Sequence, residues 1–389
     1  MSTLAEIQKL DGTKLRYALM DLAKTVPDAI ALGRGDPDLP TPDFIVEAAR
    51  KAAAGPLPIT PVAGLPKLRE VIAANAPRDH NVHVTSKNIL VTTGGQEGLF
   101  LVMSALLNPG DEVLVPDPRY SSYDQAIAHT GAATVSVPTF AEDGFDIRPP
   151  EVEKRITPRS KVLLLVTPSN PTGGILRPET AAALAELAAR HDIMIVSDEI
   201  YGKFVWPPYS HFSIASLPSM QNRVVTLSGF SKTYAMTGWR VGYVIAPSNL
   251  IEAMAVIKGH TTGPVATLSQ HAALAAAMGD DSCVAAFRQI YDKRRRILGS
   301  GLSAMGLQFG EPRGGFFFWA DASSTGMRAL ELCYLLLKDA GVLIFPGTAF
   351  GENWSNHLRI TTLQPTEILQ QAAERMTGAI ERLHRAGAA

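Results

Sequence analysis

Two basic side chains stand eight positions apart in a stretch of small and apolar residues, Lys232 and Arg240. Burial and a nearby cation both lower the pKa of a lysine amine, and the neighbours of Lys232 favour burial over solvation. A neutral lysine amine forms a Schiff base with an aldehyde. An aldehyde cofactor that also carries a phosphate would account for both residues, with Lys232 at its carbonyl and Arg240 at its phosphate.

The segments on either side of this pair are suited to hold it in place. Apolar runs at 223–228 and 240–246 lead into and out of the stretch, and each is typical of a buried strand. The alternative is that Lys232 is a surface lysine on a loop, because lysines are seldom fully buried without a partner. The order of residue types argues against that alternative.

The residues around Lys232 follow a long fixed pattern. Small, apolar and small residues precede it at 229–231, a small and an apolar residue follow at 235–236, and Gly238, Arg240 and Gly242 close the stretch. This pattern resembles the cofactor-lysine signature of the class I and II aminotransferases, which use pyridoxal 5′-phosphate. The resemblance implies that Lys232 carries the cofactor and moves the reacting proton, and that Ser231 and Arg240 contact the cofactor.

A carboxylate follows another buried strand. Residues 193–197 are mostly apolar and lead to Asp198 and then to Tyr201. A charge at the end of a buried strand is costly unless it is paired. A protonated ring nitrogen would attract it by about 4 kcal/mol at about 4 Å and an effective dielectric near 20. The family has Asp-x-x-Tyr here, which implies that Asp198 holds the ring nitrogen and Tyr201 the ring hydroxyl; a helix N-cap is the alternative for Asp198.

A glycine pair lies where a further strand ends. Residues 88–93 are typical of a strand, Gly95 and Gln96 follow, and the apolar periodicity of 99–107 predicts a helix. The start of a helix directs free N–H groups and a positive dipole end at one point, which suits a phosphate. A plain strand–helix turn is the alternative. In the family this turn holds the cofactor phosphate, which implies that role for Gly95 and Gln96.

Two other strand ends carry side chains suited to a flat ring. Residues 112–115 lead to Tyr120, and the apolar strand 161–166 leads to Asn170. Offset stacking adds about 0.5–1.5 kcal/mol beyond area burial, so Tyr120 is a candidate platform, with core packing as the alternative. The resemblance implies that Tyr120 stacks on the cofactor and that Asn170 binds both the ring hydroxyl and the substrate.

Residues near the two ends of the chain complete the resemblance. Gly35 lies in a turn-rich segment, and Arg359 lies in a strand predicted at 357–360. A guanidinium binds a carboxylate as a two-pronged fork. In the family, the equivalent residues contact the α-carboxylate of the substrate. The alternatives are a plain turn for Gly35 and a surface ion pair for Arg359. No arginine or lysine is apparent for a second substrate carboxylate.

One position departs from the family pattern. Residues 60–69 match its Thr-Pro-x-x-Gly-x-Pro-x-Leu-Arg, but Ile59 stands where relatives have a tyrosine that reaches the cofactor phosphate in the partner subunit. Isoleucine has no hydrogen-bond donor in its side chain. Either fewer groups therefore hold the cofactor phosphate, or Ile59 contacts an apolar substrate. Residues 258–264 are predicted as a loop, and in relatives this loop crosses to the partner's site.

The composition excludes several other classes. The formal net charge of −1 over 389 residues gives no general electrostatic case for nucleic acid or an anionic membrane. No apolar run approaches the roughly 18 residues of a membrane span, and the N-terminal residues do not resemble a signal peptide, so we expect a cytoplasmic protein. Cys283 and Cys333 are expected to be ordinary buried thiols. The nine histidines show no metal-ligand grouping, so no metal is expected.

Strands alternate with helices from about residue 46 to residue 283. This predicts an α/β fold, with a three-layer large domain at 46–283 and a mostly parallel sheet. The segments 1–45 and 284–389 would form a smaller α+β domain. The resemblance runs from Gly35 to Arg359 and implies fold type I of the pyridoxal-phosphate enzymes, with the ligand at strand ends.

The resemblance implies an aminotransferase that moves an amino group from an L-amino acid to a 2-oxo acid through a Schiff base on Lys232. A carbon–sulfur lyase, a decarboxylase or a cyclopropane-carboxylate synthase of the same scaffold is the alternative. A cofactor-sensing regulator is disfavoured, since the first 31 residues leave no room for a DNA-binding domain. Ile59 and residues 316–318 hint at an apolar or aromatic substrate side chain. Relatives build each site from two chains, so a homodimer with shared sites is expected.

Overall fold

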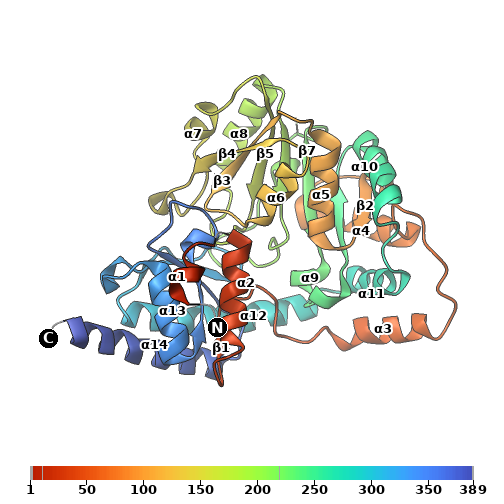
Figure 1. The fold of residues 1–389 in the computed structure, drawn as a ribbon. Coiled ribbons are helices and arrows are strands. Elements are labelled where there is room, and N and C mark those ends of the chain that lie inside the picture. Colours follow the sequence, from red (N-terminus) through yellow and green to blue (C-terminus); the bar gives the residue numbers. More distant parts are fainter. Residues whose placement is uncertain (1–2, 11, 219, 388–389) are drawn as a thin grey trace.

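The computed structural model describes residues 3–10, 12–218 and 220–387, and a seven-stranded sheet lies at its centre (Figure 1). The strand order is β2-β8-β7-β6-β5-β3-β4; β8 is antiparallel to β2 and β7, and the other neighbouring pairs are parallel. The strands are β2 (Ile89–Thr92), β3 (Glu112–Asp117), β4 (Ala133–Pro138), β5 (Ser160–Val166), β6 (Met194–Asp198), β7 (Val224–Gly229) and β8 (Gly242–Ile245).

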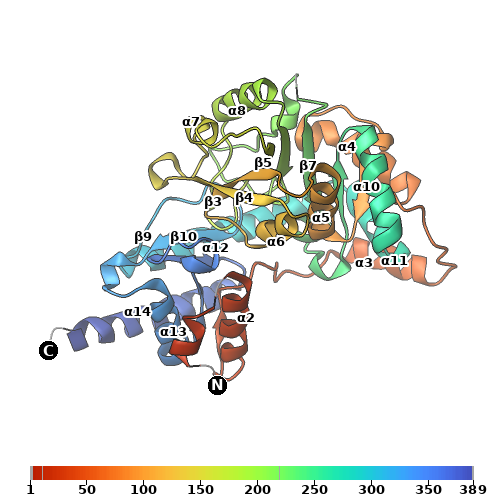
Figure 2. The same cartoon turned by 45° about the horizontal axis from the view of Figure 1, so that its top comes forward.

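Helices cover both faces of this sheet because its strands are apolar on both sides. In β5, Leu163 and Leu165 pack in one core, whereas Val162 and Leu164 pack in the other. One face carries α3 (Asp43–Ala53), α4 (Pro66–His80), α7 (Pro149–Glu153), α8 (Pro178–Arg190) and α11 (Thr267–Met278). The opposite face carries α5 (Gly94–Leu106), α6 (Ser122–Ala128) and α10 (Ser248–Thr261), as Figure 2 shows. The predicted three-layer α/β architecture is confirmed.

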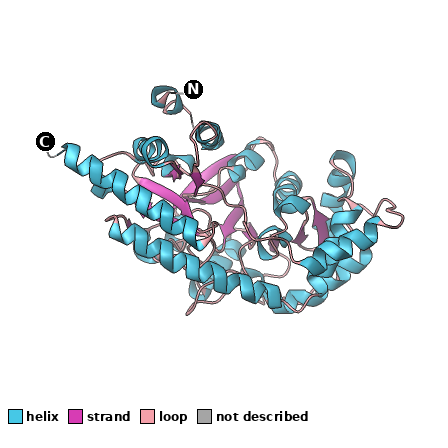
Figure 3. Ribbon diagram, turned by 90° about the horizontal axis from the view of Figure 1, so that it is seen from below, coloured by secondary structure: helices cyan, strands magenta, loops and turns pink. Residues whose placement is uncertain are grey.

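A smaller unit combines segments from both ends of the chain. Its four-stranded antiparallel sheet has the order β12-β13-β10-β9, and β1 pairs with β11 in parallel. The strands are β1 (Ile30–Ala31), β9 (Gln308–Phe309), β10 (Phe317–Asp321), β11 (Val342–Leu343), β12 (Phe345–Pro346) and β13 (His357–Thr361). The helices are α1 (Leu4–Ile7), α2 (Gly12–Ala23), α12 (Ser282–Ala304), α13 (Ala329–Ala340) and α14 (Thr366–Gly387). The long helices α12 and α14 pack side by side (Figure 3). The predicted domain boundaries stay predictions.

The structure corrects one local prediction. Residues 258–261 belong to α10 rather than to a loop. The reason is an ion pair that the sequence does not reveal: the amine of Lys258, which has no exposed side-chain surface, lies 2.7 Å from the carboxylate of Glu97 on α5. The hydroxyl of Thr262 donates to the same carboxylate. These bonds hold the polar end of α10 against the start of α5.

Candidate active site

A cavity of about 390 Å³ opens at the carboxyl ends of the central strands. All eleven residues predicted for the site line it, namely Gly35, Gly95, Gln96, Tyr120, Asn170, Asp198, Tyr201, Ser231, Lys232, Arg240 and Arg359. They come from the ends of several strands and from both the large and the small unit. The structure therefore brings the predicted set together, while the role of each member stays a prediction.

The amine of Lys232 lies inside this cavity on α9 (Phe230–Thr233), directly after β7. Its Nζ donates to the carbonyl oxygen of Gly35 at 2.7 Å and lies 3.4 Å from Oδ1 of Asp36. Burial lowers the pKa of this amine, Asp36 opposes the shift, and Arg240 adds a smaller lowering. The lowered pKa favours the neutral, nucleophilic amine.

Close backbone packing puts Lys232 in this position. A Cβ atom at Gly229 would lie 2.9 Å from Cα of Gly242 on the neighbouring strand. Only glycine allows β7 and β8 to approach so closely where the chain turns into α9. Two glycines of the sequence pattern, Gly229 and Gly242, thus have a steric cause.

An anion-binding corner lies beside the lysine. The helix α5 begins at Gly94, and Gly95 and Gln96 of its first turn line the cavity. The exposed guanidinium of Arg240 reaches this corner: its Nη1 donates to the carbonyl of Thr237 at 3.1 Å, and its Nη2 donates to that of Thr93 at 3.4 Å. Free N–H groups, the positive end of a helix and a guanidinium together suit a phosphate.

The carboxylate of Asp198 is half-buried at the end of β6. Its Oδ2 accepts a 2.8 Å hydrogen bond from the hydroxyl of Tyr123, and its Oδ1 accepts from the backbone N–H of Ile200 at 3.1 Å. Burial raises the pKa of Asp198, although both hydrogen bonds oppose the shift. Across the described ranges, no lysine, arginine or histidine forms an ion pair with it. A cationic ring nitrogen would supply that missing partner.

The N-cap alternative for Asp198 does not fit the structure, since no helix begins directly after β6. Tyr201 lies three residues on, with its ring against Phe316 and Phe317. Burial, and then the charge of Asp198, raise the pKa of the Tyr201 hydroxyl, so this group stays protonated and remains a hydrogen-bond donor. Both side chains line the cavity.

A buried arginine of the smaller unit also lines the cavity. Arg359 on β13 is 2% exposed, and its Nη1 donates to Oδ1 of Asn170 at 2.9 Å. Its guanidinium carbon lies 4.6 Å from the ring centre of Phe317 and 4.5 Å from that of Phe350. Burial, and then the nearby charge of Arg16, lower the pKa of Arg359. A bound carboxylate would offset both effects, because Arg359 forms no ion pair within the described part of the chain.

Sequence reasoning missed several side chains of this cavity, among them Tyr123 and Arg16. Tyr123 of α6 lines the cavity three residues after Tyr120 and packs edge-on against it. Arg16 of α2 also lines it and lies 5.0 Å from the ring centre of Tyr120. Tyr123 could have been suspected because it lies close to Tyr120 in the sequence, but nothing near Arg16 in the sequence marks that arginine.

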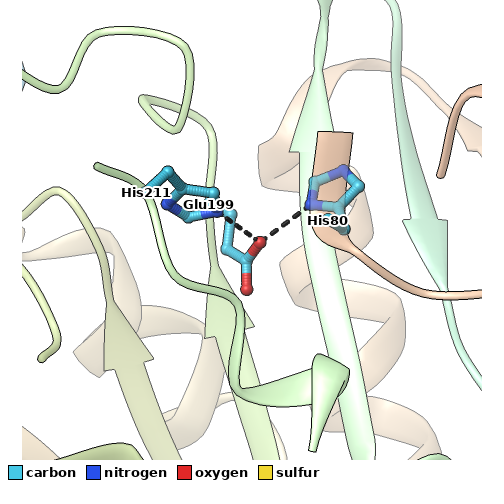
Figure 4. A group of neighbouring side chains, drawn as sticks. All are labelled: His80, Glu199 and His211. Carbon is cyan, nitrogen blue, oxygen red and sulfur yellow. Dashed lines mark hydrogen bonds and ion pairs between the residues drawn. The ribbon is translucent and has the colours of Figure 1, made fainter. Parts of the chain in front are cut away.

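The structure also brings together two histidines and a glutamate that the sequence separates (Figure 4). Oε2 of Glu199 lies 2.8 Å from Nδ1 of His80 and 2.9 Å from Nε2 of His211. Ser197 and Ser213 donate to its Oε1. Four donors thus satisfy this fully buried carboxylate, which anchors the segment after β6 on the face opposite Asp198. The prediction that the protein needs no metal is not tested by this arrangement.

Ile59 and the residues at 316–318 lie outside the cavity lining. Ile59 is 84% exposed, and Phe316, Phe317 and Phe318 are buried in the cores. These residues therefore do not form a wall for a substrate side chain within the subunit. The expectation of an apolar or aromatic substrate side chain therefore needs support from other residues.

The comparisons with known proteins agree with the geometry. Residues 27–376 match the family described as aminotransferase class I and II. An aspartate aminotransferase of Pyrococcus abyssi is 38% identical over 362 residues, which cover 92% of this chain and 93% of the relative. The aromatic-amino-acid aminotransferase 2 of Thermococcus litoralis is 36% identical over 380 residues and 97% of both chains.

Solved structures of aminotransferases share the fold over nearly the whole chain. The aspartate aminotransferase of Thermus thermophilus with maleate has a TM-score of 0.90 at 36% identity and covers 97% of this chain and 100% of its own. An aromatic aminotransferase from Pyrococcus horikoshii has a TM-score of 0.89 at 36% identity and covers 94% and 99%.

The chain belongs to the class I and II aminotransferases of fold type I. It is a pyridoxal-phosphate-dependent transferase of amino groups between amino acids and 2-oxo acids, as the resemblance implied. These relatives favour aminotransfer over the lyase, decarboxylase and synthase alternatives. The residues present fit the cofactor, since Asp198, which has no cationic partner among the described residues, faces one cavity together with the anion-binding corner at α5 and the amine of Lys232.

Proposed function

We propose that Lys232 is the residue that binds the cofactor covalently and moves the α-proton of the substrate. The single observation that carries this is the position of its buried amine, with a lowered pKa, in the cavity that also holds Asp198 and Arg240. Pyridoxal phosphate, when bound, supplies an aldehyde for this amine and a ring that accepts electrons from the substrate's α-carbon.

The remaining residues orient the two reactants. Arg359 and Asn170 would bind the α-carboxylate of the amino acid, because the amide oxygen of Asn170 already fixes one side of the guanidinium. Asp198 would hold the cationic ring nitrogen, with Tyr123 supporting the carboxylate. The N–H groups of Gly95 and Gln96, the hydroxyl of Ser231 and Arg240 would hold the phosphate. Tyr120 would cover the ring, and Tyr201 would donate to the ring hydroxyl.

An apolar or aromatic amino-acid side chain fits the mouth of this cavity. Tyr17 and Met20 of α2 line it, and the ring of Tyr17 is mostly exposed. These residues, rather than Ile59, would contact such a side chain. A relative named aromatic-amino-acid aminotransferase 2 supports this part of the proposal. A panel of amino donors with one 2-oxo acid tests it, and a donor set without leucine, methionine or phenylalanine would contradict it.

A cytoplasmic homodimer with shared active sites is also part of the proposal. Exposed apolar side chains lie on α3, α10, α11 and the segment before α4, namely Phe44, Val256, Met278, Leu57 and Ile59. Burial of such side chains against a second subunit would remove apolar surface from water. Within the described residues, no helix is long and apolar enough to cross a bilayer. Light scattering coupled to size exclusion tests the dimer, and a mass near 41.7 kDa would contradict it.

The central test is the variant Lys232→Ala. We expect it to lose borohydride-fixed cofactor in the intact mass and at least about 10³-fold in transfer rate, since positioned proton transfer and covalent catalysis both depend on the amine. Lys51→Ala, at an exposed lysine on α3, is the control and should retain both properties. Fixed cofactor at another lysine, or full transfer by Lys232→Ala, would overturn the assignment.

A further inference from the structure

A buried ion pair lies beside the anion-binding corner, outside the cavity itself. Lys258 of α10 has no exposed surface, and its Nζ lies 2.7 Å from Oε2 of Glu97 on α5. Glu97 directly follows Gln96, which lines the cavity, whereas neither Glu97 nor Lys258 lines it. The pair is therefore close to the place proposed for the cofactor phosphate without being in contact with a ligand there.

The carboxylate of Glu97 is linked to the corner through Thr93, the residue before α5. Its Oε2 accepts a 2.5 Å hydrogen bond from the backbone N–H of Thr93. The carbonyl oxygen of Thr93 in turn accepts from Nη2 of Arg240 at 3.4 Å. One residue thus joins the carboxylate to the guanidinium that is proposed to hold the phosphate. A change in the charge of Glu97 would therefore act on both the start of α5 and Arg240.

Glu97 carries a negative charge in this position. Burial alone would raise the pKa of Glu97, but hydrogen bonds from its donors, with that of Lys258 first, hold the pKa below its usual value of 4.5. Among the residues that the structure describes, Lys258 is the one cation that forms an ion pair with it. Like charges repel more strongly where water is excluded. Without the ammonium, the carboxylate would oppose the binding of a phosphate nearby.

We propose that Lys258 is a positioning residue for the cofactor phosphate: its ammonium neutralises Glu97 and so preserves the positive potential of the corner. This inference rests on the proposed function, since it takes the phosphate to bind at Gly95, Gln96 and Arg240. It also accounts for the complete burial of a lysine, which is rare without a partner. An ion pair that only held α10 against α5 would affect every form of the cofactor alike.

Two forms of the cofactor separate these roles. Pyridoxal has the ring and the aldehyde of pyridoxal phosphate, but a hydroxyl in place of the phosphate. Fluorescence titration of the cofactor-free enzyme measures the Kd of each. Lys258→Gln keeps a polar partner for Glu97 but removes the positive charge. It should weaken pyridoxal phosphate about 10- to 100-fold and pyridoxal less than about threefold. Lys154→Gln, at an exposed lysine that pairs with Glu151 at 2.6 Å, should change neither.

The opposite charge change supplies the second measurement. Glu97→Gln removes the negative charge and keeps an acceptor for the N–H of Thr93, so it should bind pyridoxal phosphate at least as tightly as the wild type. The double variant Lys258→Gln/Glu97→Gln should return to within about threefold of the wild type, because neither charge is then left unpaired. These two variants decide the question even where Lys258→Gln alone does not fold.

Three results would overturn the inference. They are weaker binding of pyridoxal phosphate by Glu97→Gln, a double variant as weak as Lys258→Gln, and equal losses of pyridoxal and its phosphate in Lys258→Gln. Each would show that the pair supports the fold rather than the phosphate site. A wild-type enzyme that binds pyridoxal as tightly as pyridoxal phosphate would instead count against the proposed phosphate site itself.

Discussion

The hydroxyl of Tyr123 donates a 2.8 Å hydrogen bond to Oδ2 of Asp198, although the two residues are 75 positions apart in the chain. Tyr123 is buried on α6, and Asp198 ends β6. Since a hydrogen bond to a carboxylate favours its charged form, this tyrosine counteracts the effect of burial on Asp198. The pair therefore sets how readily Asp198 stays ionised when it must face a cationic ring.

Tyr123→Phe should expose this dependence. Without the hydroxyl, the pKa of Asp198 rises further, because burial is then opposed by one hydrogen bond fewer. Cofactor binding needs the ionised carboxylate, so its loss toward acid should begin at a higher pH than in the wild type. Fluorescence titration with pyridoxal phosphate across pH measures this. Tyr209→Phe, at a half-exposed tyrosine outside the cavity, serves as the control, and an unchanged acid limb in Tyr123→Phe would contradict the expectation.

Glu199→Gln should destabilise the fold and change its response to acid. Burial alone would raise the pKa of Glu199, but the charges and hydrogen bonds of His211 and His80 hold it well below its usual value of 4.5. A carboxyl whose folded pKa is depressed contributes stability that is present above the unfolded value and is lost as the pH falls below it. We expect a loss of about 2–3 kcal/mol at pH 7, as for hydrogen bonds to a buried charge.

Urea unfolding at pH 7 and at pH 4 or below checks this. The difference between wild type and Glu199→Gln should shrink as the pH drops below 4.5. Glu186→Gln, at an exposed glutamate on α8, should match the wild type at both pH values. A difference that is independent of pH would mean that the histidines do not favour the ionised carboxylate.

Arg359→Lys should show how much of the binding of the α-carboxylate depends on the shape of the guanidinium rather than on its positive charge. A lysine keeps one positive charge but cannot form the two-pronged contact or stack between Phe317 and Phe350. We expect kcat/KM to fall about 10²-fold for every amino donor, whatever its side chain, since all share the α-carboxylate. Steady-state kinetics with aspartate and leucine measure it. A loss confined to one donor class would place the α-carboxylate elsewhere.

The apolar runs predicted the central strands because a buried parallel strand needs apolar residues on both faces. The runs before Asn170, Asp198 and Lys232 became β5, β6 and β7, and the predicted site residues lie where these strands end. The edge strand β4 was not predicted. Several of its residues are exposed or half-buried, so its sequence lacks a continuous apolar run.

Contacts between distant segments escaped prediction for a different reason. Lys258 meets Glu97 across 161 positions, and Arg16 meets Ser121 across 105. A lysine followed by glycine and histidine is typical of a loop when read locally, and only the buried carboxylate explains why the helix continues. Likewise, His80 and His211 contact Glu199 from separate elements, so no spacing between them marks the cluster.

Consecutive residues at the end of β6 serve opposite sides of the sheet. Asp198 lines the cavity, whereas Glu199 is held among the histidines behind it. Because side chains alternate along a strand, deletion of a single residue within β6 would move each later side chain back by one position, onto the opposite face of the sheet. Glu199 would then face the cofactor from the position of Asp198, and Ile200, which has no carboxylate, would take the position of Glu199 between the two imidazoles. The alternation of side chains along the five residues of β6 therefore determines which carboxylate faces the cavity and which one binds the two histidines.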